Sequence, residues 1–378
     1  MGYLELFYDL VFVAATMLLS NEFSHEPTLH GAWTCALMFV LLWLLWFHTT
    51  VLMNVERRDD LGQRGLIFGQ MLLIFLATLL FVDHRIASVD LVGVAYLGAV
   101  LLVAIAHHRI RGEAEPVGSW AVSRRNRLLL AGIAMAVMVV LPDDIHFVPF
   151  IVAIVLLVTP TSLRQRGVPV PAIDEHHLAE RAALLTIIVM GEAFVKAALV
   201  VSAGSITGWD VLAIVVMFVL LFGLYSVYFD DVPVAGIRPG VLFGELWLLA
   251  HLVLQLSIVG LAVGISTYLQ VGGQRVPDVG VVVLLCASAG VFTGMALINA
   301  FDRRQPRGPA IVLHAVVAVV SVALGLLTLH TELVTPGTYL LLLAGLAVLD
   351  AVLGDRLRRA TTVAPHPTTI STGSAHEL

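Results

Sequence analysis

Charged residues are scarce in this chain of 378 residues, which contains a single lysine and two cysteines. Only 13% of the residues are Asp, Glu, Lys or Arg, whereas 59% are hydrophobic, and the mean hydropathy is +0.96. A soluble domain has about 25% charged and about 45–50% apolar residues. This composition predicts an all-α, polytopic membrane protein, with the lipid bilayer as its partner. The net charge of −6 is spread over many short segments, so we expect no nucleic-acid partner.

Several motifs of known chemistry are also missing. The sequence has no GxxxxGK[ST] nucleotide-binding loop, no HExxH and no Cys/His spacing for zinc. We therefore expect no ATP hydrolysis, no metal site and no cofactor, and an enzyme is less expected than a non-enzyme. The start of the chain lacks a basic region and a cleavage site, so the first apolar run is predicted to be a retained span and not a signal peptide.

Twelve apolar runs approach the length of about 20 residues that a helix needs to cross a bilayer. The fifth and sixth runs are short and only PDDIH separates them, so a tight hairpin or two half-spans is an alternative there. We predict twelve transmembrane helices. The runs are 6–22, 31–53, 65–82, 89–106, 127–141, 146–160, 178–202, 210–229, 241–268, 279–300, 309–329 and 337–354.

The basic residues predict the orientation of these spans, because cytoplasmic loops accumulate Lys and Arg. With the N-terminus in the cytoplasm, 18 of the 21 basic residues fall on the cytoplasmic side. Arg85 and Arg275 fall outside, and Lys196 lies within a span. We predict a protein of the bacterial cytoplasmic membrane with both termini in the cytoplasm. The polar segment 361–378 is predicted to be a disordered cytoplasmic tail.

Polar residues recur at similar places in the two halves of the chain. The first and seventh spans each begin with acidic residues, and the second and eighth end in WFHTTVLMN and YSVYFDD. This pattern predicts two six-helix halves, 1–172 and 173–360, related as a parallel repeat with its axis along the membrane normal. Chance similarity between two strings of apolar helices is the alternative. The sequence leaves open whether the protein forms a homo-oligomer.

Ionisable residues inside spans are costly, so they mark buried partners or water-filled cavities. Glu5 and Asp9 lie one helical turn apart in the first span. Two carboxylates stacked in this way require either that one of them is protonated or that a cation lies between them. We expect the first and seventh spans to pack together, with Asp9 within salt-bridge reach of Arg181. Glu192 and Lys196 are also one turn apart, and we predict that they form an outer ion pair. A pair that only locks helix packing is the alternative.

The remaining candidates are polar residues near the cytoplasmic ends of the spans. His251 is either an interhelical hydrogen-bond partner or a proton carrier. We assign no catalytic residue. The predicted polar, titratable site consists of Glu5, Asp9, His48, Asn54, His177, Glu180, Arg181 and His251.

Five segments carry a resemblance to a known family. They are LELFYDLVFVAA at 4–15, WFHTTVLMN at 46–54, RRN at 124–126, HHLAERAALLTIIVMGEAFV at 176–195 and YSVYFDD at 225–231. Together they resemble the bacterial low temperature requirement protein A family. The chain departs from that family's pattern at Tyr8, His48, Leu178, Ala182 and Ala193. Lys196 is not part of the pattern. The resemblance implies a multi-span membrane protein linked to growth in the cold, without implying a substrate or a reaction.

Two classes of function remain. The first is a secondary transporter, or a proton- or ion-coupled permease, whose further partner is a small solute or ion. The second is a membrane-integral protein that does not transport, such as an enzyme acting on lipid or a factor that adjusts the cell envelope in the cold. The six-plus-six organisation favours the first class.

Overall fold

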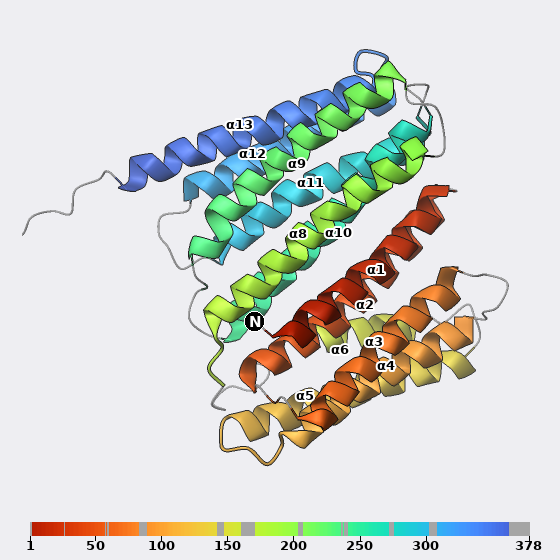
Figure 1. Ribbon diagram of the computed structural model, residues 1–378, viewed down its shortest axis with the longest axis vertical. Coiled ribbons are helices and arrows are strands. Elements are labelled where there is room, and N and C mark those ends of the chain that lie inside the picture. Colours follow the sequence, from red (N-terminus) through yellow and green to blue (C-terminus); the bar gives the residue numbers. More distant parts are fainter. Residues whose placement is uncertain are drawn as a thin grey trace, which may run out of the picture.

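The described part of the chain folds into twelve helices in the computed structural model (Figure 1). The structure describes residues 2–25, 27–56, 58, 60–82, 89–141, 147–159, 171–202, 207–235, 237, 241–271, 276–301 and 308–362. The helices are α1 (Tyr3–His25), α2 (Leu29–Val55), α3 (Leu61–Val82), α4 (Val89–Arg109), α5 (Val117–Val140), α6 (Phe147–Val158), α8 (Glu175–Ser202), α9 (Gly208–Ala235), α10 (Val241–Gln270), α11 (Asp278–Ala300), α12 (Gly308–His330) and α13 (Pro336–Thr362).

Each predicted apolar run corresponds to one of these helices. The main difference is α5, which begins at Val117 and not near residue 127. Its first turns include Trp120 and Arg124, whose side chains are 2% and 1% exposed, so tertiary packing stabilises a segment that hydropathy alone excludes. The PDDIH segment between α5 and α6 and residues 363–378 of the predicted tail lie outside the described residues.

Ten of the described helices are long and apolar enough to cross a membrane. The two others are α6, with 12 residues, and α5, which carries three arginines in its first half. Large apolar side chains are exposed on the outer faces of the helices; Phe222, for example, is 69% exposed and Val319 is 68% exposed. Several charged side chains, such as Asp9 and Arg181, are instead buried inside. This inverted distribution suits a protein whose surroundings are lipid.

Side-chain caps fix where several helices begin. Thr28, Asp60 and Asp174 each accept a hydrogen bond from the backbone N–H three residues further on, at 2.8–3.0 Å. Such caps satisfy one of the N–H groups that the first turn of a helix leaves without a partner. The cap at Asp174 sets the start of α8, and therefore the height at which the side chains of its first turns lie.

The helices form two groups, α1–α6 and α8–α13, coloured red to yellow and green to blue in Figure 1. In the first group α1 packs on α3, α3 on α4, α4 on α5 and α5 on α6. In the second group α8 packs on α10, α10 on α11, α11 on α12 and α12 on α13. The same succession of packed helices therefore occurs in both groups.

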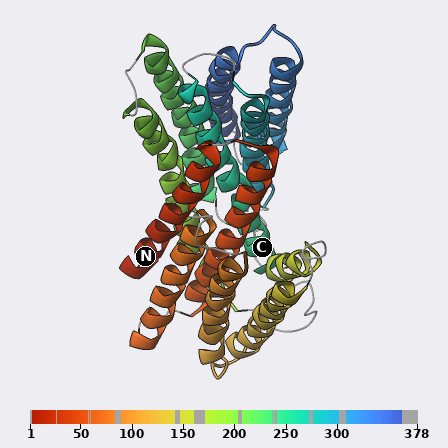
Figure 2. The same cartoon turned by 90° about the vertical axis from the view of Figure 1, so that its right-hand side faces the viewer.

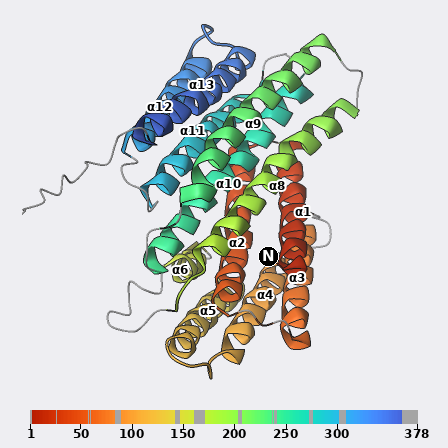
Figure 3. The ribbon, with the colours of Figure 1, turned by 60° about the vertical axis from the view of Figure 1, so that its left-hand side comes forward.

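The groups meet mainly where α1 and α2 contact α8 and α10, and we call the whole interface between the two groups the seam. Figure 2 shows α1 and α2, in red, lying between the rest of the first group and the second group, and Figure 3 shows α8 beside α1. The two most buried spans are α2 and α10, with 78% and 72% of their apolar windows buried. Side chains on the inner faces of these four helices are thus the ones most removed from lipid.

Candidate functional site

Buried charged side chains gather on the seam. Among the Asp, Glu, Lys and Arg side chains that the structure describes as buried, Asp350 is the one without a contact to the opposite group; it is paired with His314 of its own group at 2.9 Å. Every other one contacts the opposite group of helices. These residues are Glu5, Asp9, Arg124, Arg181, Glu192, Lys196 and Glu245.

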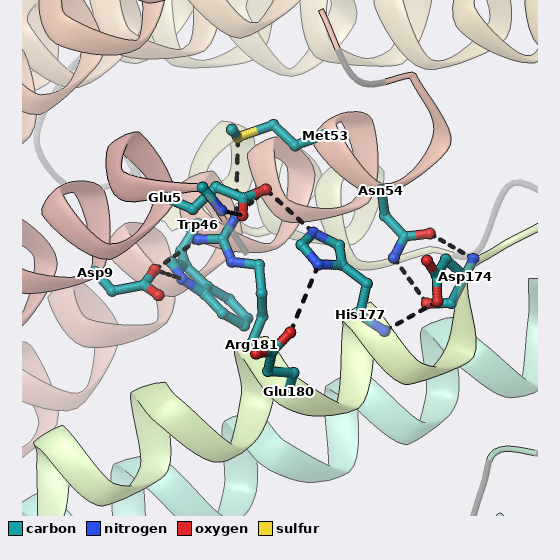
Figure 4. A network of polar contacts seen from close by, with 10 residues as sticks. Glu5, Asp9, Trp46, Met53, Asn54, Asp174, His177, Glu180 and Arg181 are labelled. Carbon is teal, nitrogen blue, oxygen red and sulfur yellow. Dashed lines mark hydrogen bonds and ion pairs between the residues drawn. The ribbon is translucent and has the colours of Figure 1, made fainter. Parts of the chain in front are cut away.

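An arginine cluster, formed by Glu5, Asp9, His177 and Arg181, lies where α1 and α8 begin (Figure 4). The Nη2 atom of Arg181 lies 2.6 Å from Oδ1 of Asp9, so the predicted contact between these residues is confirmed. The same oxygen accepts a hydrogen bond from the indole N–H of Trp46 at 2.7 Å. Arg181 and Asp9 are both fully buried. The guanidinium thus supplies the positive charge that a carboxylate needs in this environment.

Glu5 closes the arginine cluster on the side of the N-terminus. Its Oε1 atom lies 3.1 Å from Nε2 of His177 and 3.9 Å from Nη1 of Arg181. Its Oε2 atom accepts a hydrogen bond from the backbone N–H of Gly2 at 2.8 Å. Both carboxylate oxygens therefore have partners, and two cation-forming side chains of α8 face two acids of α1.

A constant separation along the chain relates the contacts between α1 and α8. Each of four side-chain contacts joins residues that are 172 positions apart, so the two helices run in the same direction and in register. Acids on α1 meet His and Arg on α8 at one end, and hydroxyls meet Glu and Lys at the other. The pairs are Glu5–His177, Asp9–Arg181, Ser20–Glu192 and Ser24–Lys196.

The second end of this interface holds a serine cluster, formed by Ser20, Ser24, Glu192 and Lys196. Ser20 contacts Oε1 of Glu192, and Nζ of Lys196 donates to Oγ of Ser24 at 3.2 Å. Among the described residues, no ion pair joins Glu192 directly to Lys196. The predicted direct pairing is therefore replaced by contacts across the seam, because the serines of α1 lie at the same heights as the two charged groups.

A pocket of about 720 Å³ lies beside the arginine cluster. Its volume is within the range of about 300–1,000 Å³ that is usual for small-molecule sites. Glu5 and His177 contribute to its wall, so the cluster borders the pocket directly. Apolar and charged side chains both line it: Gly2, Tyr3, Leu4, Glu5, Phe7, Met53, Glu56, Arg58, Arg64 and His177.

Arg124 on α5 makes a further charged contact across the two groups. It forms an ion pair with Glu245 on α10, and both side chains are 1% exposed. Its guanidinium carbon lies 5.5 Å from the ring centre of Phe47 and 5.7 Å from that of Trp120. Aromatic faces attract a cation, so these rings help to accommodate the buried charge.

The predicted site residues do not all come together. His48 lies with Arg124, whose Nη1 atom is 3.2 Å from its Nδ1, and not with the arginine cluster. His251 contacts Tyr228 at 3.0 Å, an interhelical hydrogen bond that agrees with one of its two predicted roles. The side chain of Glu180 is 42% exposed, and its Oε2 atom lies 4.0 Å from Nδ1 of His177. Glu180 therefore lies on the flank of α8, outside the buried cluster.

Asn54 lies at the edge of the arginine cluster and connects α2 to the start of α8 (Figure 4). Its amide nitrogen donates to the backbone carbonyl of Asp174, and its amide oxygen accepts from the backbone N–H of Asp174, both at 2.9 Å. Through this double contact Asn54 positions the first turn of α8, from which His177 projects.

No group of three or more His, Cys, Asp or Glu residues that could hold a metal ion occurs in the described part of the chain.

Several residues that make these buried polar contacts were not among the sequence-based site candidates, namely Ser20, Ser24, Trp46, Arg124 and Glu245. A serine in an apolar helix is common and bonds readily to its own backbone, so the sequence offered little signal for Ser20 and Ser24. Glu245 stands alone at the start of an apolar run, which was the clearest available sign of a buried partner.

The helices and the charged seam define a polytopic α-helical membrane protein with ionisable groups buried between two groups of helices. The model of the bacterial low temperature requirement A protein (LtrA) family matches residues 1–348. The chain belongs to this family.

A curated relative is an uncharacterized protein of Rhizobium meliloti (strain 1021). The two chains are 28% identical over 214 residues, which cover 50% of this chain and 48% of the relative. The chain thus aligns with about half the length of the curated relative that it matches.

Proposed function

We propose that this protein is a secondary transporter, coupled to protons or another ion, whose two six-helix groups move against each other about the seam. The concentration of buried charges on the seam carries this proposal. In transporters built from two repeats, the sites for substrate and coupling ion lie at the interface of the repeats. The bordering pocket provides room for a small solute.

The chemistry of the seam suits an interface that opens and closes. Apolar side chains could hold two helix groups together without the desolvation cost of buried ion pairs. When a charged interface opens to water, however, both partners are solvated, so opening costs less than exposing an apolar interface of the same size. Contacts such as Asp9–Arg181 and Arg124–Glu245 are therefore better suited to reversible separation than to permanent adhesion.

We further propose that residues 1–172 and 173–360 are structural repeats related by an axis along the membrane normal. The shared succession of packed helices and the separation of 172 between the facing residues of α1 and α8 support this. Equivalent helices also make equivalent contacts: Thr49 on α2 bonds to Gln70 on α3 at 3.0 Å, and Tyr228 on α9 contacts His251 on α10 at 3.0 Å.

The distribution of arginine supports a cytoplasmic location of the N-terminal ends of α1 and α8. The pocket and the arginine cluster then face the cytoplasm, and the serine cluster lies in the outer half of the membrane. The family's name carries the link to growth in the cold, and we propose that this protein has a role in such growth.

Distances between spin labels at both ends of the seam test this proposal. One pair, Leu29→Cys with Ser202→Cys, would report on the outer end; both sites are exposed, and they lie on different groups. A second pair, Leu61→Cys with His176→Cys, would report on the inner end in the same way. Cys35 and Cys286 would first be replaced by alanine.

We expect two populations in purified protein reconstituted into liposomes. In one population the outer distance should be long and the inner distance short, and in the other population the outer distance should be short and the inner distance long. A single, unchanged distance for both pairs at every pH and salt concentration tested would contradict alternating access. That result would favour the second class of function, a membrane-integral protein that does not transport.

A further inference from the structure

The serine cluster contains a carboxyl group whose partners define its protonation state. Ser20, Ser24, Glu192 and Lys196 are all at most 3% exposed. The titratable groups near Glu192 are Lys196, one turn further along α8, and the thiol of Cys35 on α2, which interacts electrostatically with both. Buried polar groups require matched donors and acceptors, so the hydrogens in this cluster can be counted.

The hydroxyl of each serine lies within hydrogen-bond reach of a carbonyl oxygen of its own helix. The Oγ atom of Ser20 lies 3.1 Å from the carbonyl oxygen of Met17, and that of Ser24 lies 2.8 Å from the carbonyl oxygen of Ser20. A carbonyl oxygen accepts and never donates, and a hydroxyl has one hydrogen. The one hydrogen of Ser20 cannot serve both Met17 and Glu192, so both contacts of a serine are hydrogen bonds only when the α8 side chain that it meets is the donor.

Lys196 meets this requirement, because its Nζ donates to Ser24. Glu192 meets it only if it is protonated, because a carboxylate has no hydrogen to give to Ser20. The other carboxyl oxygen, Oε2, is buried without a hydrogen-bond partner among the described residues. Burying an ionised carboxylate in this way costs far more than burying the neutral acid.

We propose that Glu192 is a proton-binding site: its carboxyl group carries a proton while the serine cluster is closed and donates it in a hydrogen bond to Ser20. Arg124–Glu245 and Arg181–Asp9 provide the contrast within the same chain, since each of those carboxylates faces a guanidinium that donates to it or neutralises it. Glu192 instead faces a hydroxyl whose one hydrogen has a second acceptor, the carbonyl oxygen of Met17.

The consequence for coupling rests on the proposed transport function. When the two groups separate at this end, Ser20 moves away from Glu192 and water enters. Glu192 then releases its proton to water, and the carboxylate forms the ion pair with Lys196 that helix spacing allows. Closing takes up one proton and opening releases one. A lower pH therefore favours the closed end, and a higher pH favours the open end.

Infrared spectroscopy tests the protonation itself, without any assumption about transport. We expect the wild-type protein at neutral pH to show the carbonyl stretching band of a protonated carboxyl group, which shifts in heavy water. Glu192→Gln should remove this band, whereas the matched variant Glu245→Gln should not. Ser20→Ala should shift the band to higher frequency and keep it, because it removes only the acceptor.

The proposed site is wrong if the Glu192→Gln spectrum shows the same protonated-carboxyl bands as the wild-type spectrum. Should Glu192→Gln fail to fold, the Ser20→Ala spectrum decides in its place, since an ionised Glu192 would leave no shifted carboxyl band.

Spin-label distances between Leu29→Cys and Ser202→Cys test the coupling. The ratio of open to closed molecules should rise by up to about tenfold per pH unit in the wild-type background. In the Glu192→Gln background it should not depend on pH. If the labelled sites do separate but the open-to-closed ratio of Glu192→Gln depends on pH as it does in the wild type, the coupling is wrong and the proposed transport is unaffected. Absence of any separation contradicts transport and coupling together, and the infrared result then still decides the protonation.

Discussion

Removing Arg181 should destabilise the protein strongly, because two carboxylates depend on it. In Arg181→Met, Asp9 keeps only the hydrogen bond from Trp46, and Glu5 loses a cation 3.9 Å away. Removing one partner of a buried ion pair costs about 3–5 kcal/mol. We expect a loss near the upper end for Arg181→Met. Asp9→Asn should lie near the lower end, because Asn still accepts from Trp46 and Arg181 retains Glu5.

The double variant distinguishes a true pair from two independent residues. Asp9→Asn with Arg181→Met leaves no uncompensated charge between these two positions, so its loss should be smaller than the sum of the single losses. Side chains in direct contact have interaction energies of about 0.5–3 kcal/mol, and we expect at least about 1 kcal/mol here.

Equilibrium unfolding in mixed micelles, followed by tryptophan fluorescence, measures these values. Trp46 lies at the cluster and serves as a local probe. Glu180→Gln is a matched control on the same helix: its side chain is 42% exposed, so the variant should stay within about 0.5 kcal/mol of the wild type. Additive losses, or an unfolding free energy of Arg181→Met that equals that of the control, would refute the reasoning.

Further predictions concern the geometry of the Arg124 side chain, the pH dependence of a helix cap and the orientation of the protein in the membrane. Arg124→Lys should lower the unfolding free energy by about 1–2 kcal/mol, because lysine keeps the charge facing Glu245 but loses the planar contact with the aromatic rings; equal stability would contradict this. The pKa of the Asp60 carboxyl lies below its usual value, because the backbone N–H of Gln63 and then the side chain of Arg109 donate to it. The contribution of Asp60 to the stability of the folded state is therefore complete above the unfolded-state pKa of about 3.9, and it is lost as the pH falls through the folded-state pKa. Hydrogen-exchange protection at the start of α3 should weaken in that acidic range in the wild type, and an equal weakening in Asp60→Asn would argue against the assignment. Reporter fusions should score cytoplasmic after four arginines and external at three other sites, and one inverted pair between α6 and α8 would overturn the orientation. The arginines are Arg64, Arg127, Arg166 and Arg307, and the external sites are Glu26, Asp143 and Gly204.

The sequence alone was sufficient for the class of protein, for the approximate bounds of the helices and for one central contact. Length and hydropathy are local properties, so each apolar run predicted its helix with little dependence on the rest of the fold. The contact between Asp9 and Arg181 was predictable for an equally general reason. A carboxylate within a span requires a cation, and few basic residues lie within spans.

The contacts of Arg124 and of the serine cluster depended on the tertiary structure. Arg124 and Glu245 are distant in sequence, on helices whose own patterns say nothing about which other helix they face. Glu192 and Lys196 fit an ion pair by helix spacing, but the choice between that pair and the serines depends on how α8 is rotated against α1. Hydropathy fixes which residues avoid water, whereas the partner of each buried polar group is set by the heights and rotations of packed helices, which only the assembled fold determines.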